Sequence, residues 1–198
     1  MKDALITTLR NRNSGTAEFR KASDLLAQIL CAETLAKLTN TEISVETPVG
    51  KTSGLSMPDD VMVVPILRAA LAFLPAFMQM MPDVPVGMLG IARDERTAQA
   101  SEYYRKLPAN LPSRAIILDP MLGTGGSASL AVNILVSEGY KAKDIYFTGV
   151  VAVHEGIDRL AEAIPLSNIS VAVIDVELNE QKYIVPGLGD YGDRYFGT

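Results

Sequence analysis

Cysteine and histidine are nearly absent from this chain of 198 residues, which has one of each. Because Cys31 is alone, no disulfide framework and no cysteine-based zinc site can form. His154 is the only histidine, so a histidine-rich metal cluster is excluded too, and we expect a structural role for this residue at a strand-to-helix junction. A chain of this size buries roughly two thirds of its unfolded surface, so it needs neither a disulfide nor a metal to fold.

Long apolar runs and an excess of positive charge are also lacking. The first ten residues, MKDALITTLR, contain an acid and no long apolar core, so they do not resemble a secretory signal. Arg68, Arg93 and Asp119 interrupt the most apolar stretches, none of which approaches the length of a membrane span. The formal net charge of −5 argues against non-specific binding of nucleic acid. We therefore expect a cytoplasmic protein with no membrane or nucleic-acid partner.

What the chain does have is a series of short apolar runs separated by helical patterns. Strand-length runs occupy residues 61–66, 84–92, 115–119, 146–153 and 169–175. Helices are expected over 68–81, with a kink at Pro75, over 127–138 and over 156–164. Apolar strands without polar alternation, alternating with helices, predict a doubly wound α/β domain with a mainly parallel sheet covered on both faces. We expect one domain over 1–198.

Three other segments complete the expected organisation. Residues 17–38 carry apolar side chains at helical intervals, and 42–57 are typical of a β-hairpin that forms an arm near the N-terminus. The arm and the apolar excess suggest a homodimer or a higher homo-oligomer. The polar segment 93–112 is long for a loop in a compact domain, and such loops are often functional, so it is our candidate for a lid.

The strongest chemical signal is the stretch AIILDPMLGTGGSA. Asp119 stands at the end of a predicted strand, where ligands of parallel sheets collect. Gly123, Gly125 and Gly126 allow a tight turn into a helix whose free amides favour an anion, and Thr124 and Ser127 add hydroxyls. We expect this loop to hold a phosphate monoester, with Asp119 placed to accept hydrogen bonds from ribose hydroxyls.

Two other interpretations of the loop remain open at this point. One is a strand–helix turn in which the glycines serve geometry only. The other is the first motif of an S-adenosylmethionine methyltransferase, which also places an acid before a glycine turn. That motif usually opens its domain, whereas here it follows two strands and the next strand ends at Val153 and His154. The phosphate interpretation is therefore favoured.

Taken together, the motifs resemble the uracil phosphoribosyltransferases. LRNRNSGTAEFR is similar to the start of that family, VVPILRA to its first sheet motif, and IARDE with EYYRKLP to its central flap. DPMLGTGGS resembles its motif for 5-phosphoribosyl 1-diphosphate (PRPP), and YIVPGLGDYGDRYFGT its C-terminal uracil signature. The resemblance spans the chain and implies a pentosyltransferase of pyrimidine salvage that forms UMP and diphosphate from uracil and PRPP.

The resemblance also implies a set of site residues. Arg68, Arg93, Asp119 and Asp190 would be catalytic. Arg68 and Arg93 would contact the diphosphate, and Asp190 would lie near it and its Mg²⁺, an ion carried by PRPP and not held by the protein directly. PRPP would also be bound by the loop Asp119, Pro120, Met121, Leu122, Gly123, Thr124, Gly125, Gly126 and Ser127. Uracil would be read, chiefly by backbone groups, at Ile184, Gly189, Asp190 and Tyr191. Within the single domain, 1–60 would form the N-terminal helix and arm, 61–176 the PRPP-binding core and 177–198 the uracil-binding segment.

The sequence departs from the family pattern at Ala70 and Ala72, where many members have glycine, and at Tyr191, where many bacterial members have alanine. The flap lacks a proline that often follows its glutamate. The alanine methyls could crowd the diphosphate pocket or tighten the packing of the next helix. A non-catalytic relative that binds PRPP or UMP as a sensor is the alternative function.

Overall fold

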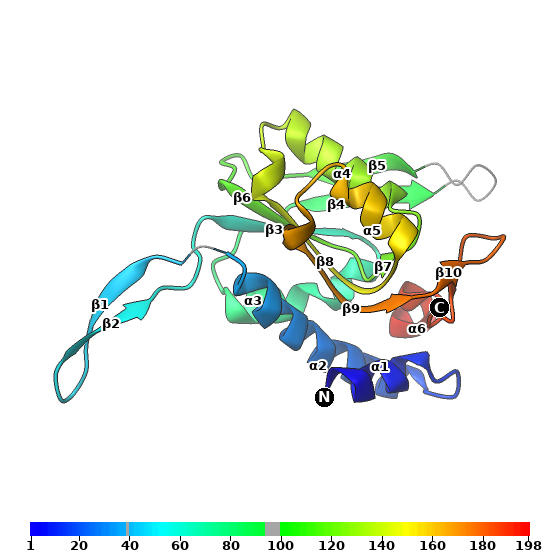
Figure 1. The fold of residues 1–198 in the computed structure, drawn as a ribbon, viewed down its shortest axis with the longest axis horizontal. Helices are drawn as coiled ribbons and strands as arrows, with labels where there is room; N and C mark the ends of the chain where they lie inside the picture. The colour runs from blue at the N-terminus through cyan, green and yellow to red at the C-terminus, as the bar shows by residue number, and fades with distance from the viewer. Residues whose placement is uncertain (39, 94–99) are drawn as a thin grey trace.

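The computed structural model describes residues 1–38, 40–93 and 100–198. Within them the main sheet has the order β5-β4-β3-β6-β8, continued by β9 on the far side of β8 (Figure 1). All neighbours run parallel except β4 and β5, which are antiparallel. The strands are β3 (Val61–Leu67), β4 (Met88–Arg93), β5 (Ala100–Lys106), β6 (Arg114–Leu118), β7 (Met121–Leu122), β8 (Ile145–Val153) and β9 (Ile169–Asp175).

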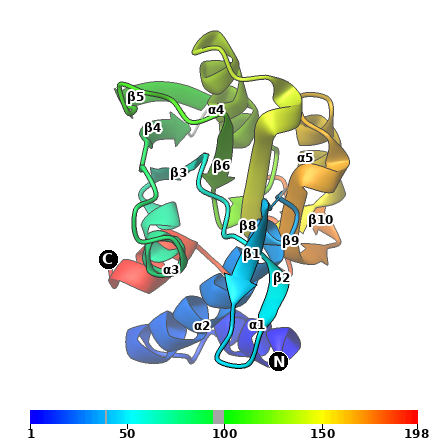
Figure 2. The same cartoon turned by 90° about the vertical axis from the view of Figure 1, so that its left-hand side faces the viewer.

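Helices cover both faces of this sheet, which explains the unbroken apolar runs of its strands. On β3, Val61 and Val63 pack into one apolar cluster while Met62 and Val64 pack into the other. The first cluster includes side chains of α1 (Lys2–Arg10), α2 (Thr16–Leu35), α3 (Leu74–Met80) and α6 (Tyr191–Phe196). The second lies under α4 (Gly126–Ser137) and α5 (His154–Ala161), on the opposite side of the sheet (Figure 2). The expected doubly wound α/β class is confirmed.

The segment 68–81 is not the single kinked helix that we predicted. A 3₁₀ turn, η1 (Ala69–Ala72), is followed by the separate helix α3. Pro75 lies in the first turn of α3, where a backbone N–H has no partner within the helix in any case. The proline therefore favours the start of this helix and does not kink it. Ala70 and Ala72 are both buried in the first apolar cluster, which favours the packing interpretation of their methyl groups.

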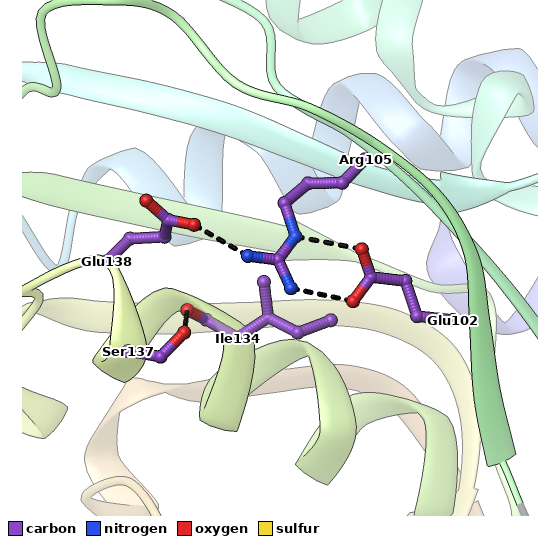
Figure 3. Close-up of polar contacts among 5 residues, drawn as sticks. All are labelled: Glu102, Arg105, Ile134, Ser137 and Glu138. Atoms are coloured by element: carbon purple, nitrogen blue, oxygen red, sulfur yellow. Dashed lines mark hydrogen bonds and ion pairs between the residues drawn. The ribbon is translucent and has the colours of Figure 1, made fainter.

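The polar segment 93–112 is only partly a loop. Residues 100–106 form β5, an edge strand paired antiparallel with β4, so the interpretation of the whole segment as a loop is wrong. Arg105 fixes this strand to the end of α4: its guanidinium donates two hydrogen bonds to Glu102, of 2.8 and 2.7 Å, and one of 2.6 Å to Glu138 (Figure 3). The tip of the hairpin, 94–99, lies outside the described residues.

The predicted arm is confirmed as the hairpin of β1 (Glu42–Glu46) and β2 (Lys51–Leu55), which extends away from the rest of the molecule (Figure 1).

The remaining elements differ from the prediction mainly in their bounds. The predicted helix 17–38 is present but ends at Leu35, and the predicted strand 84–92 begins only at Met88. Helix α1 was not predicted. A second small ladder joins β10 (Glu177–Leu178) to β11 (Ile184–Val185), and the short turns η2 (Ala142–Asp144) and η3 (Leu166–Asn168) precede β8 and β9. Among the described helices none is long and apolar enough to cross a membrane.

Candidate active site

A cavity of about 180 Å³ lies beyond the carboxyl ends of the parallel strands, where the fold class places ligands. It lies between two segments far apart in the sequence, which we call the phosphate loop (residues 119–127) and the base loop (residues 184–190). The cavity is lined by Asp119, Met121, Leu122, Gly123, Thr124, Gly125, Gly126, Ser127, Ala128, Lys182, Tyr183, Ile184, Gly189 and Asp190. Most of the expected site residues are therefore brought together by the fold.

The phosphate loop begins where β6 breaks away from β8. The amide of Asp119 still donates to the Thr148 carbonyl, at 3.1 Å, and the Pro120 carbonyl then accepts from the Val150 amide at 3.0 Å. Pro120 is thus part of the loop's scaffold and is buried rather than part of the cavity wall. Gly149 makes this close approach possible, because a Cβ there would lie 2.8 Å from the Asp119 carbonyl oxygen.

Two glycines fix the way the loop enters α4. Gly125 has a φ of 74°, a left-handed conformation that favours glycine, and it stands immediately before the first residue of α4. Gly156 of α5 lies behind the loop, where a Cβ would come within 2.2 Å of the Gly123 carbonyl oxygen. The backbone of α5 therefore supports the loop directly, and the first residues of α4, Gly126, Ser127 and Ala128, line the cavity.

Asp119, the first residue of the phosphate loop, also lines the cavity. Its Oδ1 accepts a hydrogen bond of 3.3 Å from the Met121 amide. Burial at this position raises the pKa of the Asp119 carboxyl to about 7, and the single hydrogen bond from Met121 opposes that rise only in part. A carboxyl that lines a cavity and has a pKa near neutrality is a candidate functional group.

The base loop supplies the other wall of the cavity through Ile184, Gly189 and Asp190. Gly187 and Gly189 have positive φ values of 58° and 81°, so the chain makes two turns that other residues rarely adopt. Asp190 is the N-cap of α6, and its Oδ1 accepts a hydrogen bond of 2.9 Å from the Asp193 amide. The expected uracil segment therefore faces the expected phosphate loop across one cavity.

The side chain of Tyr191 points away from this cavity. It is buried among apolar residues, with its ring edge-on to Phe19 and Phe73, and its hydroxyl lies 2.7 Å from the Ser23 hydroxyl. Only its backbone can take part in binding at the base loop. The aromatic ring fills the space between α6 and α2, which gives a packing reason for a large residue at this position.

Of the two arginines expected at the diphosphate, the structure describes the side chain of Arg68 but not that of Arg93. Arg68 follows the end of β3 at the same edge of the sheet, but it does not line the cavity, and its exposed side chain donates a 3.1 Å hydrogen bond to Asp193. Arg93 is the last residue of β4. Its side chain, like residues 94–99, lies outside the described part of the chain.

Lys182 and Tyr183 line the cavity and were missed from the sequence. Lys182 has a positive φ of 64°, and its ammonium lies 3.9 Å from Glu155 at the start of α5. Among the described residues of the lining, it is the one with a cationic side chain. The turn that contains Lys182 is closed by the Asn179 side chain, whose oxygen accepts a hydrogen bond of 2.8 Å from the Tyr183 amide. No local sequence pattern predicts that contact. His154 is exposed as the first residue of α5, outside the cavity lining.

A family model described as Uracil phosphoribosyltransferase matches residues 2–198. This chain belongs to the uracil phosphoribosyltransferase family. It is 44% identical over 199 residues to the uracil phosphoribosyltransferase of Malacoplasma penetrans, covering 100% of this chain and 95% of that protein. The AQ2163 protein of Aquifex aeolicus has a similar solved structure, with a TM-score of 0.86, 32% identity and coverage of 100% of this chain and 94% of that one.

A more distant solved structure shares the fold of this chain. A hypoxanthine-guanine phosphoribosyltransferase of Bacillus anthracis aligns with a TM-score of 0.53 at 10% identity, covering 81% of this chain and 80% of that chain. At that identity the likeness supports the fold alone. The family match places the glycine-rich turn among phosphoribosyltransferases, and the methyltransferase interpretation is no longer needed.

Proposed function

We propose that this chain transfers ribose 5-phosphate from PRPP to uracil, forming UMP and diphosphate. The observation that supports this most directly is the single cavity bounded by the phosphate loop on one side and the base loop on the other. Transfer between two substrates requires both to be held in one place with their reacting atoms in line. A cavity with an anion site at one wall and rigid backbone at the other meets that requirement.

The phosphate loop would hold the 5-phosphate of PRPP. The amides at the start of α4 and the hydroxyls of Thr124 and Ser127 can donate hydrogen bonds to its oxygens. Lys182 lies at the edge of the same cavity and offers a positive charge to a dianionic group. The phosphate would fix the position of the ribose relative to Asp119.

Asp119 would act on the ribose. Departure of diphosphate leaves positive charge on the sugar ring, and a carboxylate fixed beside the ring stabilises that charge where it forms. The same carboxylate can accept hydrogen bonds from the ribose hydroxyls. Because its pKa is near 7 before substrate binds, the positive charge that develops on the ribose ring would favour the ionised form of Asp119.

Arg68, Arg93 and Asp190 would act at the diphosphate end, with Mg²⁺ as cofactor. Arginine's planar fork suits phosphate oxygens. Within the described residues no group of three or more His, Cys, Asp or Glu side chains could hold a metal by itself. The carboxylates of Asp119 and Asp190 line one cavity, a donor type that Mg²⁺ accepts beside substrate phosphates, so the site fits an ion delivered with PRPP. Bound there, Mg²⁺ would neutralise charge on the leaving diphosphate.

Uracil would be read by the base loop. Its two carbonyl acceptors and its N–H donor can be matched by main-chain groups at Ile184, Gly189, Asp190 and Tyr191, whose conformation is fixed by the two positive-φ glycines. We also propose the internal division into 1–60, 61–176 and 177–198, a cytoplasmic location, and a homo-oligomer, for which exposed apolar side chains on the β1–β2 hairpin are the support.

The test is formation of UMP from uracil and PRPP with Mg²⁺, with cytosine, hypoxanthine and orotate assayed in parallel. We expect turnover that is selective for uracil and is strongly reduced in Asp119→Asn. The sensor alternative predicts a folded wild-type protein that binds PRPP or UMP but turns over no base. Binding of PRPP measured by calorimetry on the same preparation separates that outcome from simple inactivity of the sample.

A further inference from the structure

A partly buried ion pair joins the first helix of the chain to the last strand of the sheet. Arg10, the last residue of α1, donates hydrogen bonds of 2.9 and 2.5 Å to the two carboxylate oxygens of Asp175, the last residue of β9. The Asp175 side chain is 4% exposed and that of Arg10 is 25% exposed. The pair lies at the carboxyl end of β9, the same edge of the sheet as the cavity.

The same two side chains hold Gly187 of the base loop on both of its polar backbone groups. The Gly187 amide donates to Asp175 Oδ2 at 2.8 Å, and the Gly187 carbonyl accepts from Arg10 Nη1 at 2.9 Å. Gly187 has a φ of 58°, and a Cβ there would lie 2.2 Å from the Ile184 carbonyl oxygen. The loop is therefore fixed at its tightest turn, two residues before Gly189, which lines the cavity.

A second arginine strengthens the link between this loop and the N-terminal helices. Arg194 of α6 donates to the Leu188 carbonyl at 2.8 Å and to the Asn11 carbonyl at 2.7 Å. Its guanidinium also lies over the ring of Phe19 in α2, 4.5 Å from the ring centre. Two consecutive residues of the base loop, Gly187 and Leu188, are thus held by arginines that join it to α1 and its connection to α2.

We propose that Arg10 and Asp175 are positioning residues that set the affinity for uracil, so that α1 is part of the base half of the site. The proposal rests on the proposed function, because it assumes that the base loop receives uracil. A buried ion pair is weak support for stability by itself, since desolvation opposes its attraction, whereas its hydrogen bonds to Gly187 give it a specific geometric task. Neither side chain lines the cavity, so both act through the loop's backbone.

The experiment compares Arg10→Lys, Arg10→Met and Asp175→Asn with the wild-type enzyme and with the control Lys2→Met. Lys2 also belongs to α1 and also pairs across to another element, at 2.8 Å from Glu33, but it does not contact the base loop. For each variant the KM for uracil, the KM for PRPP and the dissociation constant of PRPP without uracil are measured. Melting temperatures select the temperature at which every variant is folded.

We expect the KM for uracil to rise about tenfold or more in Arg10→Met and Asp175→Asn, as small displacements of substrate-positioning groups produce. PRPP binding should change less than about twofold, because the phosphate loop is built by β6, β8 and α5. Arg10→Lys keeps the positive charge but loses the two-pronged guanidinium, so its KM for uracil should fall between those of wild type and Arg10→Met. Lys2→Met should match wild type.

An unchanged KM for uracil in folded Arg10→Lys and Asp175→Asn would overturn the positioning role and leave only a structural ion pair. Equal losses of uracil and PRPP affinity would overturn it as well, since the effect would then not be specific to the base loop. A wild-type enzyme that forms no UMP would instead overturn the proposed function, and the inference with it.

Discussion

Asp119 is the residue whose surroundings give the clearest pH prediction. Its pKa in the folded protein is about 7, against an ordinary value of 3.8. The carboxylate is the form that stabilises positive charge on the ribose, so kcat/KM for PRPP should fall as the pH drops through about 7. A pH profile of the wild type and of the residual activity of Asp119→Asn checks this, because the limb near pH 7 should be missing from the variant.

The same pKa predicts the opposite trend for stability. Protonated Asp119 favours the folded state, so its contribution is complete below about pH 4 and is lost as the pH rises toward 7. Asp119→Asn should therefore be more stable than wild type at pH 8, by roughly 1–2 kcal/mol, with the difference shrinking toward pH 5. Urea unfolding at the two pH values measures the difference. A variant that loses stability together with activity at pH 8 would contradict the assignment of Asp119 as a functional acid.

Lys182 combines a strained backbone with a place in the cavity lining, and the two properties can be separated by substitution. A left-handed conformation costs a side-chain-bearing residue about 1 kcal/mol, so Lys182→Gly should be more stable than Lys182→Ala by about that amount. Both variants remove the ammonium and should raise the KM for PRPP roughly threefold to tenfold. Chemical denaturation and initial rates at varied PRPP provide the two measurements. An unchanged KM in both would show that Lys182 makes no contact with the phosphate.

At the scale of single elements, the segment 93–112, which includes β5, is our candidate lid. Arg105 ties β5 to Glu138, the residue that follows α4 (Figure 3), and residues 94–99 of the segment lie outside the described part of the chain. We expect deletion of part of the segment 93–112 to raise hydrolysis of PRPP relative to formation of UMP, because water would reach the ribose more easily. Diphosphate and UMP measured in the same reaction give the ratio. A ratio equal to that of wild type would count against the lid.

The elements also show which features the sequence could predict. The phosphate loop was predictable because the strand end, the glycines and the helix start are adjacent in the chain. β5 was not, because an exposed edge strand carries polar and aromatic residues without an apolar face. The inward direction of Tyr191 and the place of Lys182 depend on contacts with Ser23 and with the Asn179 turn, which no local pattern encodes. The Arg10–Asp175 pair joins residues 165 positions apart, so it could not be predicted from the sequence for the same reason.

At the scale of the whole molecule, the two halves of the proposed site come from different parts of the chain. β6, β8 and α5 build the phosphate side, whereas the base loop is held by α1 and its connection to α2, at the opposite end of the sequence. The proposed division at residues 60 and 176 therefore does not separate independent units. The N-terminal segment and the C-terminal segment need each other to form the base side.

The β1–β2 hairpin extends from this body with apolar side chains that the described chain leaves exposed, including Ile43, Val45 and Leu55, at 41%, 37% and 67%. A two-stranded hairpin alone is marginally stable, so this one is expected to gain from packing on a second copy. We expect the double variant Val45→Ser, Leu55→Ser to lower the molar mass measured by light scattering. Leu166→Ser, at a leucine of η3 that is 62% exposed, should leave the molar mass unchanged. A wild-type protein that is monomeric at every concentration would rule out the assembly. An equal loss of molar mass in both variants would show that the hairpin has no specific role in it.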